Sequence, residues 1–150
     1  MKGLTHVIFG LGFVSVLLSF MNVPFPLWII GTLIISPIFS RLPDYDQKVA
    51  RITFNHIVPH RGKHSHNLLY IIPVIAAFFL TDYEILVLLL ISVFGALFAH
   101  TLVDAFNSAG VWFGIFKISF GNLRWDSFFA NSFFKLIGIV LLTISILPYM

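Results

Sequence analysis

Long apolar stretches, interrupted by a few short polar segments, dominate the chain. No Asp, Glu, Lys or Arg occurs from Gly3 to Ser40, and this run is too long for one membrane-spanning helix of about 20 residues. The two prolines and the asparagine of Asn22–Pro26 divide the run. The pattern therefore predicts a helical hairpin with spans at about 4–21 and 25–40.

Three further apolar runs follow, at about 68–80, 85–105 and 128–147. The first of them is short and contains Pro73, and in the last one Lys135 can extend its ammonium group to the membrane surface. Segment 106–127 is rich in Gly, Asn and aromatic residues, so it either lies in the interface or re-enters the membrane. We expect an all-α fold: one membrane-embedded domain over residues 1–150, with about five transmembrane helices and a polar loop.

The composition agrees with a membrane protein and excludes several other classes. The chain is 59% hydrophobic and only 10% charged, whereas a soluble domain has about 25% charged residues. The net charge of +3 comes from scattered residues without a long basic run, which does not favour nucleic-acid binding. The absence of cysteine excludes disulfides and thiolate zinc sites, so any metal must be bound through nitrogen and oxygen.

Basic residues predict the orientation in the membrane. The loop from Arg41 to Asn67 contains five of them, whereas the short segments Asn22–Pro26 and Thr81–Glu84 contain none. Because basic loops stay in the cytoplasm, we expect a multi-pass protein of the plasma membrane with this loop on the cytoplasmic side. The five basic residues are Arg41, Lys48, Arg51, Arg61 and Lys63.

Under this topology, the unusual polar side chains fall on one side of the membrane. His100 and Asp104 are four residues apart and share a helix face, and ionisable groups inside an apolar helix mark a functional site. After Pro43 we expect an extended backbone, from which Asp44 and Asp46 point the same way. Two such close negative charges require a cation nearby.

The residues themselves indicate a metal site. Neutral imidazole and carboxylate together suit zinc first, with manganese or iron as alternatives. There are enough candidate ligands for one or two ions. His66 directly precedes an apolar run that fixes its direction, whereas His64 follows His60 by four residues, which a local helical turn would bring together.

Four pieces of sequence resemble a known family. A histidine near the start, "LPDYD", "HRG" followed by "SHNLL", and "AHTLVDAFNSAGV" are similar to the motifs of the LexA-regulated, membrane-bound metal-dependent hydrolase family, in the same order over about residues 6–111. That family is distantly similar to zinc-dependent phospholipases C and single-strand nucleases. The resemblance implies the metal-binding set His6, Asp44, Asp46, His60, His66, His100 and Asp104.

The chain departs from the family pattern at one position. The family places its second histidine five residues after the first, but position 65 is a serine. His66 fits with one inserted residue and His64 fits with one deleted residue. We favour His66, because "SHNLL" restores the connection to the next apolar run.

These observations predict a membrane-bound metal-dependent hydrolase that acts on a phospholipid or another phosphoester at the cytoplasmic face. Arg61 or Lys63 would hold the anionic group, and a carboxylate, for which we name Asp46, would act as the base. The alternatives are a divalent-cation transporter and a structural membrane protein stapled by its metal. Few polar residues occur on the outer side beyond Asp82 and Glu84, which favours the enzyme.

Overall fold

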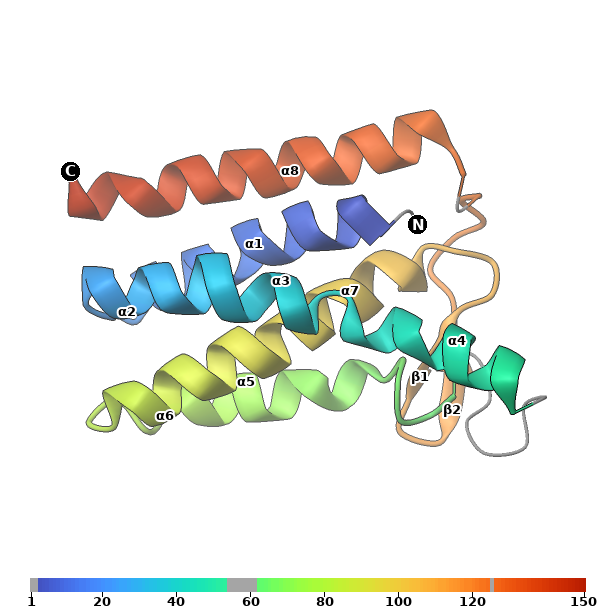
Figure 1. The fold of residues 1–150 in the computed structure, drawn as a ribbon, viewed down its shortest axis with the longest axis horizontal. Helices are drawn as coiled ribbons and strands as arrows, with labels where there is room; N and C mark the ends of the chain where they lie inside the picture. The colour runs from blue at the N-terminus through green and yellow to red at the C-terminus, as the bar shows by residue number, and fades with distance from the viewer. Residues whose placement is uncertain (1–2, 54–61, 125) are drawn as a thin grey trace.

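The computed structural model describes residues 3–53, 62–124 and 126–150 and forms an antiparallel bundle of helices (Figure 1). The N-terminus, α4 and a small hairpin lie at one end of the bundle, and the C-terminus lies at the other. The helices are α1 (Gly3–Phe20), α2 (Phe25–Ile29), α3 (Ser36–Phe39), α4 (Tyr45–Ile52), α5 (Ile71–Ala77), α6 (Glu84–Leu89), α7 (Ala96–Ala105) and α8 (Phe128–Ile146).

Several of these helices join into longer rods. A π-helical turn, Ile30–Ile35, joins α2 to α3, and the 3-10 turn Leu42–Asp44 leads into α4. A second π-helical turn, Leu90–Gly95, joins α6 to α7. The 3-10 turn Leu68–Tyr70 leads into α5, and the 3-10 turn Leu147–Tyr149 ends the rod that contains α8.

Among the described residues, four rods are long and apolar enough to cross a membrane: Gly3–Phe20, Phe25–Ile52, Glu84–Ala105 and Phe128–Tyr149. The predicted helical membrane bundle is therefore confirmed. The run at 68–80 forms a shorter helix, Leu68–Ala77, whose length of about 15 Å is half of the hydrocarbon core. It packs against the Leu90–Gly95 turn.

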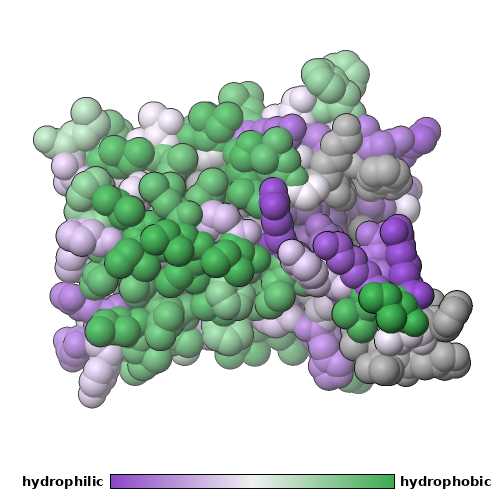
Figure 2. Space-filling view, viewed as in Figure 1, coloured by the Kyte–Doolittle hydropathy of each residue, from purple (hydrophilic) through white to green (hydrophobic). Residues whose placement is uncertain are grey.

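The surface of the bundle agrees with this reading. Figure 2 shows hydrophobic side chains over most of the visible face, with hydrophilic ones gathered mainly at the end that holds α4 and the hairpin. Exposed apolar residues on the rods include Leu33, Ile34 and Ile38. Such a surface is favourable in lipid and costly in water.

The expectation of an extended backbone at Asp44 and Asp46 was wrong. Leu42–Asp44 is a 3-10 turn, Asp44 has φ −70° and ψ −15°, and α4 follows directly. Pro43 lies in the first turn, where its missing N–H costs no hydrogen bond. The second rod therefore continues through the region that we expected to be a loop.

Segment 106–127 contains a β-hairpin and no re-entrant helix among its described residues. Strands β1 (Val111–Phe113) and β2 (Phe116–Ile118) are antiparallel, with Phe113 opposite Phe116. Gly114 has φ +61°, which a two-residue hairpin turn requires at its first position. The fold thus adds a small sheet to the predicted all-α bundle.

Two glycines let α1 and α8 cross at close range. A Cβ atom built on Gly12 would lie 2.1 Å from the carbonyl oxygen of Gly138, and one built on Gly138 would lie 2.4 Å from that of Ile8. Next to this crossing, the Thr5 hydroxyl donates a 2.6 Å hydrogen bond to Asn131 Oδ1. Small residues at such crossings allow helix backbones to approach in membranes.

We predict that Gly138→Ala lowers the melting temperature of the detergent-purified protein, because forced overpacking costs about 1–3 kcal/mol. Gly3→Ala is the matched control, since nothing lies within 4 Å of a Cβ at that position. Thermal unfolding followed by circular dichroism measures both variants. Equal melting temperatures for the two would contradict a tight crossing at Gly138.

Candidate metal centre

Six of the predicted ligands meet at one end of the bundle. They come from four separate parts of the chain: α1, the start of α4, the loop before Leu68, and α7. Most are fully buried, whereas the Asp44 side chain is 41% exposed. The six residues, which we call the His–Asp cluster, are His6, Asp44, Asp46, His66, His100 and Asp104.

Asp104 lies at the centre of the cluster. One carboxylate oxygen is 3.5 Å from His6 Nε2. The other is 3.4 Å from His66 Nε2 and 3.7 Å from His100 Nε2. Three imidazoles from three different elements therefore surround one buried carboxylate.

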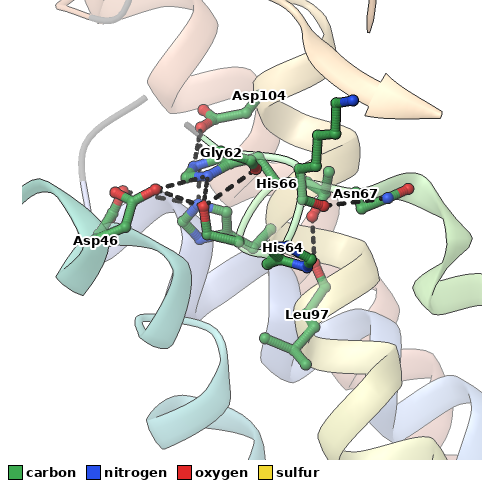
Figure 3. A network of polar contacts seen from close by, with 12 residues as sticks. Asp46, Gly62, His64, His66, Asn67, Leu97 and Asp104 are labelled. Atoms are coloured by element: carbon green, nitrogen blue, oxygen red, sulfur yellow. Dashed lines mark hydrogen bonds and ion pairs between the residues drawn. The ribbon is translucent and has the colours of Figure 1, made fainter. Parts of the chain in front are cut away.

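The two other carboxylates extend the cluster on opposite sides. Asp44 Oδ1 is 3.7 Å from His100 Nε2, and Asp46 Oδ2 is 3.3 Å from His66 Nδ1. Figure 3 shows His66 between Asp46 of α4 and Asp104 of α7. Although α4 is helical, both acids thus reach the cluster, each through a different histidine.

This geometry fits a metal ion. Ligand atoms of His6, Asp44, His100 and Asp104 all lie within 4.8 Å of one another. Two ligands about 2.1 Å from a tetrahedral zinc ion are about 3.4 Å apart, close to the N···O separations found here. Both ring nitrogens of His6, and Nε2 of His100, are buried without a hydrogen bond to any described residue, as expected of nitrogens that bind a metal.

The backbone orients His100 for this role. Its Nδ1 lies 2.7 Å from the carbonyl oxygen of Ser40, and because a carbonyl only accepts, the ring proton belongs on Nδ1. Nε2 then carries the lone pair that faces Asp44 and Asp104. A hydrogen bond of this kind on the far nitrogen is the usual support of a metal-binding histidine. The His6 ring stacks on His100 with centroids 3.8 Å apart.

The β-hairpin positions His66. The Trp112 N–H donates a 2.8 Å hydrogen bond to the His66 carbonyl, and the Gly114 N–H donates to Asn67 Oδ1 at 3.3 Å. Asn67 also caps the following helix by accepting from the Leu69 N–H. The direction of His66 is therefore fixed by the hairpin as well as by the apolar run after it.

Ser65 completes the surroundings of His66. Its hydroxyl donates a 2.5 Å hydrogen bond to Asp46 and lies 3.1 Å from His66 Nδ1. Burial alone lowers the pKa of His66, but its hydrogen bonds with Asp104 and Asp46 outweigh burial and raise the pKa above the ordinary value. A proton held on His66 must leave before that ring can bind a metal.

The structure separates the two candidate histidines. His66 is fully buried in the cluster, whereas His64 is exposed and its carbonyl accepts a hydrogen bond from the Tyr70 hydroxyl. Lys63, predicted to hold an anion, has its Nζ 5.0 Å from the centre of the Trp112 ring. His60 and Arg61 lie outside the described residues.

Sequence reasoning missed three supporting groups. The Ser40 carbonyl and the Trp112 N–H belong to the backbone, so no residue type reveals them. Ser65 stood out only as a mismatch with the family pattern, yet its hydroxyl can donate a hydrogen bond to a carboxylate. Its position beside His66 was the available signal.

The chain was compared with protein-family models, curated proteins and solved structures. A family model described as YdjM inner membrane protein matches residues 1–148, nearly the whole chain. No curated protein and no solved structure matches. The match confirms that the chain belongs to a family of inner membrane proteins, while the hydrolase activity and the similarity to phospholipases C stay predictions.

We predict that His66→Ala lowers the metal content of the purified protein at least tenfold, because it removes a buried ring that contacts both Asp46 and Asp104. His64→Ala should keep the wild-type content, since that side chain points to solvent. Elemental analysis after equilibration with zinc or manganese measures both. Loss of metal in His64→Ala with retention in His66→Ala would reverse our assignment.

Proposed function

The chain belongs to the YdjM inner membrane protein family, and from this premise we propose that it is a membrane-bound, metal-dependent hydrolase of a phosphoester at the cytoplasmic membrane face. The observation that carries the proposal is the His–Asp cluster. Three imidazoles and a carboxylate are buried together where a membrane helix ends, an expensive arrangement that a bound cation would stabilise.

The proposed metal ligands are His6, Asp44, His100 and Asp104, whose ligand atoms lie closest together. Zinc fits this nitrogen and oxygen set first, and manganese or iron are alternatives. His66, which contacts both Asp46 and Asp104, and Asp46 are proposed to complete this set for one ion or to hold a second. When bound, the metal supplies Lewis acidity that polarises a phosphoryl oxygen and makes water nucleophilic at neutral pH.

Asp46 is the proposed general base. Its Oδ2 accepts from the Ser65 hydroxyl and contacts His66, so its position is fixed. His66 Nδ1 lies 3.3 Å from this carboxylate oxygen and is proposed to donate a hydrogen bond that orients it. Asp104 lies on the other side of the His66 ring, 3.4 Å from Nε2, and supports its orientation.

One observation favours cation transport as a second candidate. The hydroxyls of Thr32, Ser36 and Ser40, each four residues apart on one helix face, are buried without a hydrogen-bond partner among the described residues, as is that of Ser92. They form a polar line from the cluster into the bundle.

This polar line ends at a closed apolar region. Leu18 and Trp28 belong to a fully packed cluster of buried hydrophobic residues beyond Thr32, and Trp28 donates a hydrogen bond to the Ser15 carbonyl. A path for cations needs polar groups through to the far side. The closed end supports hydrolysis over transport.

We expect the metal-loaded protein to release phosphorylated head groups from mixed phospholipid vesicles. Mass spectrometry of the released head groups measures this activity. Asp104→Asn should lose both metal and activity, because Asp104 contacts all three histidines. Asp46→Asn should lower the turnover number by about 10²–10⁴-fold, the usual contribution of a general base, while keeping more metal than Asp104→Asn.

The control for these variants is Asp82→Asn, which changes an exposed acid in the turn at the opposite end of the bundle and should behave as wild type. A fully metal-loaded protein that releases no head group would reject the hydrolase. In that case, metal uptake into sealed vesicles would indicate transport, and loss of thermal stability on chelation would indicate a structural metal.

The orientation gives a separate prediction. Because the chain has no cysteine, single cysteines can be labelled without background. Cysteines at Lys48 and Asn122, both exposed at the cluster end, should react with an impermeant maleimide only from the cytoplasmic side. A cysteine at Asp82 should react only from outside, and the opposite pattern would place the site on the outer face.

A further inference from the structure

A groove opens on the surface between α1 and the rod that contains α3 and α4. Its volume is about 520 Å³, within the about 300–1,000 Å³ of small-molecule sites. The residues that line it are Val7, Pro37, Ile38, Arg41, Leu42 and Tyr45.

The groove lies directly beside the His–Asp cluster. Val7 follows His6 in α1, and Leu42 and Tyr45 lie on either side of Asp44. Asp44 is the most exposed member of the cluster, with 41% of its side chain accessible. The groove and the accessible edge of the cluster are therefore neighbours on the same surface.

The polarity of the groove changes along its length. Val7, Pro37 and Ile38 make one part apolar, and Arg41 and Tyr45 make the other part polar. Lys48 adds a second positive charge, with its Nζ 4.6 Å from the centre of the Tyr45 ring. This pattern matches an amphiphile with a hydrocarbon chain and an anionic head.

The surroundings of the groove indicate that lipid reaches it. Ile34 and Ile38, on successive turns of the same rod, are 56% and 60% exposed, and only a hydrocarbon environment makes that favourable. Arg41 lies at the cluster end of this apolar surface, where a rod that crosses a membrane would meet phospholipid head groups. A guanidinium binds phosphate oxygens with two parallel hydrogen bonds.

We propose that this groove binds one anionic phospholipid, with an acyl chain against Val7 and Ile38 and its phosphate at Arg41. The phosphodiester is then held next to Asp44, at the open edge of the cluster. This assigns the anion-binding role to Arg41, in addition to the residues expected from the sequence. The role of the lipid as substrate rests on the proposed function, but its binding needs no metal.

The test measures lipid retained by the detergent-purified protein after exposure to equal amounts of phosphatidylglycerol and phosphatidylcholine, using native mass spectrometry. Wild-type protein should retain phosphatidylglycerol preferentially. Arg41→Gln should lower this retention about tenfold, the loss expected for one charge-assisted hydrogen bond. Arg51→Gln removes an exposed charge outside the groove and should have no effect.

A second pair of variants tests the apolar part. Ile38→Trp fills the groove and should lower retention of the lipid, whereas Ile34→Trp adds the same bulk one turn away, outside the groove, and should not. Glycerol phosphate, which has the head group without the chains, should fail to displace the lipid. Displacement by glycerol phosphate would show recognition of the head alone and overturn the proposal.

Equal lipid retention by the wild type and Arg41→Gln would overturn the proposal. Equal losses of retention in Arg41→Gln and Arg51→Gln would also overturn it, because they would indicate general charge attraction. Chelator-treated protein should retain the lipid as well as metal-loaded protein does. Lipid retention without head-group release would therefore reject hydrolysis and keep the groove. Head-group release together with unselective lipid retention would support hydrolysis and reject the groove as the lipid-binding site.

Discussion

Asp104 is only 1% exposed, and its carboxylate lies on a helix that is long and apolar enough to cross a membrane. An ionised group in such a place is stable only with compensating charge or strong hydrogen bonds. Three imidazoles, those of His6, His66 and His100, lie 3.4–3.7 Å from it, and the proposed metal ion would supply the compensating charge. Because these rings come from α1, a loop and α7, the requirements of one carboxylate bring three distant parts of the chain together.

Two of the parts that supply a ring are held in place by separate contacts. Thr5, which precedes His6, is hydrogen-bonded to Asn131 of α8, and the glycine crossing keeps those helices close. The β-hairpin holds the backbone of His66. Ligand positions in a metal site must be accurate to about 0.2 Å, so these supports, distant from one another in sequence, serve the same site.

The sequence predicted the bundle and the membership of the cluster better than it predicted local geometry. A long apolar run in lipid must form a helix to satisfy its backbone hydrogen bonds. His100 and Asp104 stood out because ionisable groups are rare in such helices. The prediction of an extended backbone at Asp44 and Asp46 was wrong, because a proline can start a helical turn as readily as it ends one. Strands of three residues, such as β1, are too short to leave a recognisable pattern.

The direction of the ligands depends on a region that contains none of them. Both rods that bring carboxylates to the cluster contain a π-helical turn before the site, Ile30–Ile35 in one and Leu90–Gly95 in the other, and these turns pack against each other. A Cβ on Gly31 would lie 2.5 Å from the Ser92 hydroxyl oxygen, so their contact is close.

A π turn inserts one residue into a helix and so rotates everything after it by about 100° relative to an uninterrupted α-helix. The four-residue spacing of His100 and Asp104 therefore explains why they share a face, but not why that face points to α1. The rotation introduced at Leu90–Gly95 decides that, and the paired turn at Ile30–Ile35 does the same for Asp44 and for the Ser40 carbonyl that orients His100. The middle of the bundle thus sets the geometry of the site at its end.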